Sequence, residues 1–114
     1  MATSPQFTSI PNCKGITLST ANSIQTIITA GSNGSRLDRV FITATSTTSA
    51  GNIRLYVSGK MIKDVPVKAI TATPGVANFM AEVTLDIVLA NGQTLQASST
   101  TSNSFDVVAI SGDF

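Results

Sequence analysis

The stretch Arg36–Gly59, with the sequence RLDRVFITATSTTSAGNIRLYVSG, decides what kind of fold the chain can adopt. Apolar residues occupy every second position in both of its halves, at Val40, Ile42, Ala44, Ile53, Leu55 and Val57. Alternation with a period of two is typical of β-strands that have one buried and one exposed face. We therefore expect two β-strands here, with these apolar side chains in the core.

The polar segment Ser46–Gly51 separates the two expected strands and has the length and the glycine of a hairpin loop. We therefore predict that the two strands pair with each other as a β-hairpin. Leu37 is out of phase with the alternating residues that follow it, which predicts a β-bulge or a second buried surface near Asp38.

Further short strands are expected on both sides of this stretch, separated by turn residues at the spacing of roughly 8–12 residues that is typical of all-β domains. These strands are expected at 16–18, 24–29, 61–67, 78–85, 93–98 and 105–110, and residues 87–89 form a further brief apolar run. The glycine-containing segments 30–35, 59–60 and 90–92 have the composition of hairpin turns. Pro66 cannot donate to a strand ladder, so strand 61–67 is expected at the edge of a sheet.

The pattern predicts one all-β domain, a single-domain antiparallel β-sandwich of about eight strands with jelly-roll-like connections. An immunoglobulin-like sandwich fits the same spacing. Residues 1–12, which contain Pro5 and Pro11, are expected to form an extended N-terminal arm, and residues 13–114 the sandwich. The arm can be a mobile terminus, a strand laid along a sheet edge, or a docking arm that places Phe7 and Ile10 on another subunit.

The composition is that of a neutral β-protein with little surface charge. Charged residues make up only 11% of the 114 residues and leave a formal net charge of +1, whereas about 25% charged residues are usual in soluble domains. Such a surface repels neighbouring molecules weakly, which suits a protein that assembles with others. The absence of a basic run argues against nucleic acid as a partner. The sequence also has neither the pattern of a signal peptide nor an apolar run of membrane-spanning length, so we expect a soluble protein made in the cytoplasm with no membrane partner.

Catalytic and metal-binding patterns are missing from the sequence. There is no histidine, so no Ser-His-Asp triad, Cys-His pair or imidazole metal site can form. Glu82 and Asp86 share a strand face but lie about 13 Å apart along an extended chain, too far for a glycosidase pair. Cys13 is the single cysteine and is expected to be buried or half-buried. We expect no enzymatic activity, no cofactor and no metal site.

A binding surface is more in keeping with the residues that stand out. Arg36, Asp38, Arg39 and Arg54 concentrate scarce charge around the predicted hairpin, where Arg and Asp can pair within the chain or with a partner. Tyr56, on the outward side of its strand, is suited to anchor an interface. The candidate interface residues are therefore Phe7, Ile10, Arg36, Asp38, Arg39, Arg54 and Tyr56.

Four further segments stand out as motifs: AGSNGSRLDR at 30–39, TSAGNIRLYV at 48–57, KDVPV at 63–67 and SFDVVAISGDF at 104–114. Together they resemble a family of small structural proteins encoded by tailed bacteriophages and prophages. The chain departs from the family pattern at Asp64, where many members carry Glu, and in a shorter turn at 58–61.

The resemblance implies a structural virion protein, most readily a capsid decoration or cement protein that stabilises the phage head. Its expected partners are the major capsid protein and further copies of itself, as a dimer or trimer. The expected location is the head surface of the virion, after synthesis in the cytoplasm of the bacterial host. The alternatives are a glycan- or receptor-binding module, or another component of the neck or tail.

Overall fold

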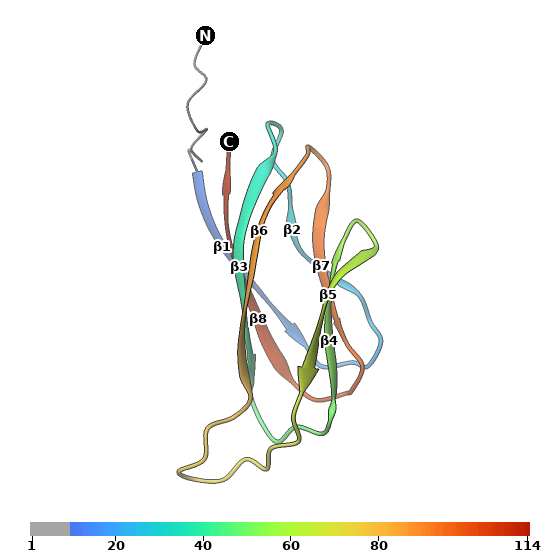
Figure 1. Ribbon diagram of the computed structural model, residues 1–114, viewed down its shortest axis with the longest axis vertical. Helices are drawn as coiled ribbons and strands as arrows, with labels where there is room; N and C mark the ends of the chain where they lie inside the picture. Colours follow the sequence, from blue (N-terminus) through green and yellow to red (C-terminus); the bar gives the residue numbers. More distant parts are fainter. Residues whose placement is uncertain (1–9) are drawn as a thin grey trace.

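The computed structural model describes residues 10–114, which form eight β-strands and no helix (Figure 1). The strands are β1 (Ile10–Leu18), β2 (Gln25–Thr29), β3 (Ser35–Ala44), β4 (Gly51–Val57), β5 (Lys60–Val67), β6 (Met80–Leu89), β7 (Thr94–Ser99) and β8 (Phe105–Asp113). They are arranged in two antiparallel sheets that face each other. The predicted all-β sandwich of about eight strands is confirmed.

The first sheet has the strand order β1-β8-β3-β6 and the second sheet has the order β2-β7-β4-β5. Consecutive strands change sheet at every connection except that between β4 and β5. Strands distant in sequence therefore pair with each other. β8, the last strand, lies between β1, the first, and β3.

Three of the predicted hairpins are wrong. Segments 30–35, 46–51 and 90–92 connect strands of opposite sheets, so β3 and β4 do not pair with each other. Within residues 10–114, only the turn between β4 and β5 closes a hairpin, in which Val57 pairs with Lys60. Its two central residues, Ser58 and Gly59, have φ values of 47° and 86°, as the type I′ turn of a two-residue hairpin requires. Glycine and polar residues suit a loop that crosses between sheets equally well, so composition did not distinguish the two kinds of connection.

The predicted bulge near Asp38 is confirmed. The pairing register of β3 shifts between Leu37 and Arg39 against both of its neighbours. The extra residue allows Leu37 and Val40 both to be fully buried although they are three positions apart. At the same level of β6, Asp86 has a φ of 49°. Residues 80–89 therefore form one irregular strand, which extends the expected strand 78–85 through the apolar run 87–89.

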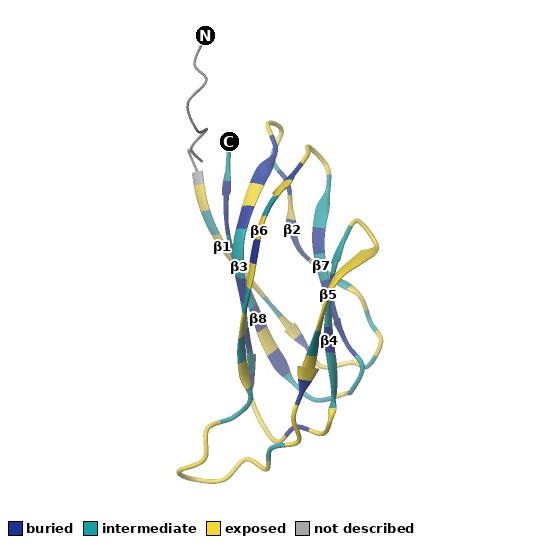
Figure 2. Cartoon of the chain, in the orientation of Figure 1, coloured by how far each residue is buried: buried dark blue, intermediate teal, exposed yellow. Residues whose placement is uncertain are grey.

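The core lies between the inward faces of the two sheets (Figure 2). Its largest fully buried side chains are Phe105, Leu18, Leu37, Ile42, Ile53, Leu55, Leu89, Leu95, Val40 and Val107. Phe105 packs edge to face on Phe79, with ring centroids 6.4 Å apart. Each fully buried side chain of this size contributes about 1.5–3 kcal/mol relative to exposure, so this core is the main stabilising feature.

Both prolines in strands lie in edge strands, Pro11 in β1 and Pro66 in β5. The prediction from Pro66 is confirmed. β1 begins at Ile10, and its residues 10–12 pair with Ser111–Asp113 of β8, so the sandwich begins before the expected boundary at residue 13. Cys13 is exposed on this edge strand, which corrects the expected burial. No helix within the described residues is long and apolar enough to cross a membrane.

Candidate interaction surface

The charged candidates do not form a single surface. Because β3 and β4 belong to opposite sheets, Arg36, Asp38 and Arg39 lie on the first sheet, while Arg54 and Tyr56 lie on the second. The two sets occupy opposite faces of the sandwich, and the common outer face that a β3–β4 hairpin would present does not exist. Phe7 lies outside the described residues. Ile10 is described as the first residue of β1, where its backbone pairs with Asp113.

The charges of β3 pair mainly with β6. Arg39 binds Glu82 at 2.8 Å and also contacts the neighbouring Asp38 at 3.3 Å. Arg36 forms an ion pair with Asp86. These side chains are roughly half exposed, so water screens the pairs and each contributes only about 0–1 kcal/mol. They align β3 with β6 and leave little free charge for a partner.

On the second sheet, Arg54 and Tyr56 are also engaged within the chain. The Tyr56 hydroxyl lies 2.9 Å from the Ser98 hydroxyl, and the ring is half-buried. The Arg54 Nε is buried without a hydrogen-bond acceptor among the described residues and lies 3.7 Å from an Asp64 oxygen. A role of either residue in an interface stays a prediction.

The motif segments 30–35 and 112–114 meet at one end of the sandwich, where they hold the start of β1. The buried Ser35 hydroxyl donates to the Asp113 carboxylate at 2.5 Å and accepts from the Gly31 N–H at 3.0 Å. Asn12 of β1 donates its side-chain N–H to the other carboxylate oxygen of Asp113. We call Asn12, Gly31, Ser35 and Asp113 the terminal lock. The motif residues Gly31, Ser35 and Asp113 thus have a structural role, because they connect β3, β8 and β1. No local sequence pattern could indicate this role, since Ser35 and Asp113 are 78 positions apart in the chain.

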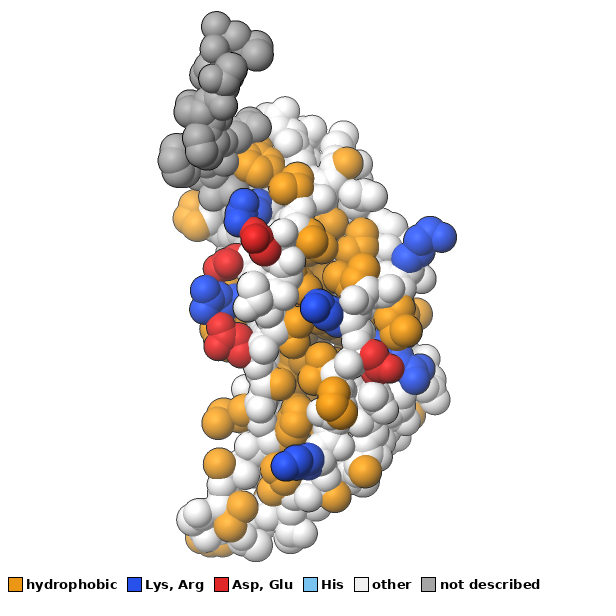
Figure 3. Space-filling view, in the orientation of Figure 1, with side chains coloured by type: hydrophobic (Ala, Val, Ile, Leu, Met, Phe, Trp, Pro, Cys, Tyr) orange, Lys and Arg blue, Asp and Glu red, His pale blue; other side chains and the backbone are white. Residues whose placement is uncertain are grey.

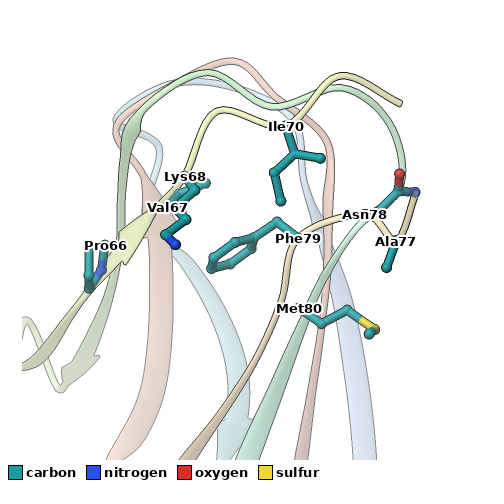
Figure 4. Close-up of a pocket in the computed structure, with 8 residues that line it drawn as sticks. All are labelled: Pro66, Val67, Lys68, Ile70, Ala77, Asn78, Phe79 and Met80. Atoms are coloured by element: carbon teal, nitrogen blue, oxygen red, sulfur yellow. The ribbon is translucent and has the colours of Figure 1, made fainter. Parts of the chain in front are cut away.

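A cavity that the sequence did not predict lies between the end of β5 and the start of β6. It measures about 540 Å³ and is lined by Pro66, Val67, Lys68, Ile70, Ala77, Asn78, Phe79 and Met80. Figure 4 shows the Phe79 ring pointing toward Val67, with Ile70 above them. β5 and β6, which flank the cavity, are edge strands of different sheets and are not hydrogen-bonded to each other.

The cavity continues into a band of apolar side chains along the gap between β5 and β6 (Figure 3). Its half-buried members pack against the core, and we call them, with the buried Val67, the apolar seam: Val57, Val65, Val67, Phe79, Ala81, Val83 and Ile87. The alternation in 78–85 predicted a buried face for Phe79, Ala81 and Val83. They stay partly exposed because no strand of the described chain closes the gap between the two edges.

Three lysines lie in or directly after β5, on the β5 side of the apolar seam. Lys63 is paired with the fully buried Leu55 of β4, so its side chain leaves β5 on the inward face, toward the seam. Lys60 stands at the start of β5, and Lys68 lines the cavity at its end. Within residues 10–114, none of these lysines takes part in an ion pair.

No protein-family model matches the sequence, and no curated protein matches it. The described residues contain no group of His, Cys, Asp and Glu that could hold a metal ion. What the geometry offers is a β-sandwich with an apolar seam, a lysine-lined rim and two open strand edges. Such a surface can bind another polypeptide.

Proposed function

We propose that this chain is a structural protein of a bacteriophage virion, a capsid decoration or cement protein that stabilises the head by binding neighbouring subunits. The observation that carries the proposal is the apolar seam between β5 and β6, since a partly exposed stretch of core is suited to hold a second polypeptide. The resemblance of the four motifs to structural proteins of tailed phages supplies the biological setting.

The proposed mechanism is binding without turnover. The sandwich acts as a rigid body whose low charge permits close approach to copies of itself and to the capsid lattice. The terminal lock fixes the start of β1, from which residues 1–9 continue. We assign the sandwich to the jelly-roll type, a frequent fold of capsid proteins. This assignment is supported by the eight strands and by the order β1-β8-β3-β6 against β2-β7-β4-β5, in which every connection except that between β4 and β5 crosses between the sheets.

Quantitative mass spectrometry of purified virions of the phage that encodes the chain tests the proposal. A decoration protein is expected at hundreds of copies per particle, and removing it should lower the temperature at which heads release their DNA. A handful of copies per particle would place the chain in the neck or tail instead. Its absence from washed virions would overturn a virion role altogether.

A further inference from the structure

The free edge of β6 includes a regular stretch beside the apolar seam that lacks protection against strand addition. β1 carries Pro11 near its start, and β2 has only five residues with a register shift. β5 has Pro66, a register shift and the inward Lys63. Prolines, short strands, bulges and inward charges are the usual means of preventing strand addition. Segment 80–84 of β6 has none of them, because it contains no proline and pairs with β3 without a shift.

The backbone groups that this edge offers can be assigned from the ladder. The Ala44 N–H donates to the Phe79 carbonyl at 2.8 Å, so the N–H and C=O groups of Phe79 point toward β3. An antiparallel ladder alternates, so those of Ala81 and Val83 also point toward β3. Those of Met80, Glu82 and Thr84 then point away from the sheet. The free edge therefore presents three residues whose backbone donors and acceptors have no partner strand among residues 10–114, beside the apolar seam.

We infer that this edge binds an extended segment of a partner protein, which adds a strand to β6 and covers the apolar seam. Every second side chain of such a strand faces the seam. A large apolar residue fits the cavity next to Phe79. Met80, which also lines the cavity, is 66% exposed, so partly covering it would remove further apolar surface from water.

The lysines beside the seam favour a negative charge on the partner segment. Lys63 lies four residues before Val67, which lines the cavity, or about 13 Å along the strand. An acidic residue four positions from the apolar anchor therefore faces Lys63 from the same side of the added strand. Side chains on the opposite face of the added strand lie next to Glu82 and Asp86 of β6. Neutral residues are favoured at those positions, because acidic ones would face like charges. The partner is thus an extended segment with an apolar and an acidic residue four apart. Residues 1–9 of the chain contain no acidic residue and do not meet this description.

This inference rests on the proposed structural role, since it names the chemistry of the segment that the protein holds. The inference is tested with the isolated full chain, whereas the proposed function is tested on virions. A failure of peptide binding is therefore distinguishable from absence of the protein from virions. The probe is a labelled, capped eight-residue peptide with Leu, Val and Glu at its second, fourth and sixth positions and Thr elsewhere. A second probe has the order reversed, for the other strand direction. The control peptides have Lys in place of Glu.

Fluorescence anisotropy should show that one of the Glu peptides binds at least about tenfold more tightly than its Lys counterpart. Lys63→Glu should remove this preference, whereas Lys14→Glu, the same change on β1, should leave it intact. Thr84→Pro should abolish binding, because it removes one outward N–H without breaking the ladder to β3. Thermal unfolding of each variant shows that the fold is retained.

Amide exchange followed by NMR gives a readout that does not depend on any variant. Peptide binding should slow exchange at Met80, Glu82 and Thr84, while Ala81 and Val83 are already protected by β3. Equal affinity for the Glu and Lys peptides, or new protection on β1 in place of β6, would overturn the inference. Protection of the three amides that grows with protein concentration alone would make a second copy of the chain the occupant and would also overturn it.

Discussion

Replacing Ser35 by alanine is predicted to destabilise the protein through the terminal lock. The side chain is fully buried, donates to the Asp113 carboxylate and accepts from the Gly31 N–H. A hydrogen bond to a charged group contributes about 1.5–3 kcal/mol, and a donor left without its partner adds about 1 kcal/mol more. We expect Ser35→Ala to lower the free energy of unfolding by about 2.5–4 kcal/mol. At about 4 °C per kcal/mol for a domain of this size, the melting temperature should fall by about 10–16 °C.

Urea unfolding followed by far-ultraviolet circular dichroism measures this loss, and Ser111→Ala is the matched control. Ser111 is also buried in the first sheet, but its hydroxyl has no hydrogen-bond partner among the described residues. Its removal should change stability by less than about 0.5 kcal/mol, or increase it. A double-mutant cycle of Ser35→Ala with Asp113→Ala should give a coupling energy of at least about 1 kcal/mol. Equal losses for the two serine variants, or no coupling to Asp113, would refute the reasoning.

Three further substitutions test other parts of the structure by the same unfolding assay. Phe105→Ala should cost about 3–5 kcal/mol, because it empties the centre of the core next to Phe79; a loss below about 1 kcal/mol would contradict the packing. Gly34 and Gly75 have φ values of +86° and +84°, but only at Gly34 would a Cβ meet a backbone oxygen, at 2.7 Å. Gly75→Ala should therefore cost about 1–2 kcal/mol and Gly34→Ala at least about 1 kcal/mol more; equal costs would show that the close approach is unimportant. Arg39→Gln should cost less than about 1 kcal/mol, because its ion pairs are half exposed, and a larger loss would mean that they are less screened than their exposure indicates.

Local patterns in the sequence were sufficient for the fold class. The alternation in 53–57 predicted β4, and the phase change at Leu37 predicted the bulge that the register of β3 confirms. Pro66 predicted an edge strand for β5. Each of these features depends on neighbouring residues alone, since side-chain alternation and the missing N–H of proline are properties of the local backbone.

The partners of the strands were not predictable in this way. Segment 46–51 was expected to close a hairpin, yet it crosses from the first sheet to the second. A glycine-containing polar loop permits both routes, and the choice depends on which strands bury their apolar faces together. The partners of the charged side chains were unpredictable for the same reason. Arg36 pairs with Asp86, which is 50 positions away and which no local pattern connects to it.

The sequence by itself determined that this protein is an all-β domain with neutral surfaces, because alternation and composition are properties of the chain. Only the tertiary structure decided where a partner could bind. The apolar seam, the outward amides of β6 and the inward Lys63 belong to segments that become neighbours when the two sheets pack. β5 and β6 end their sheets here without pairing with each other, so apolar residues that the sequence assigns to the core remain partly exposed.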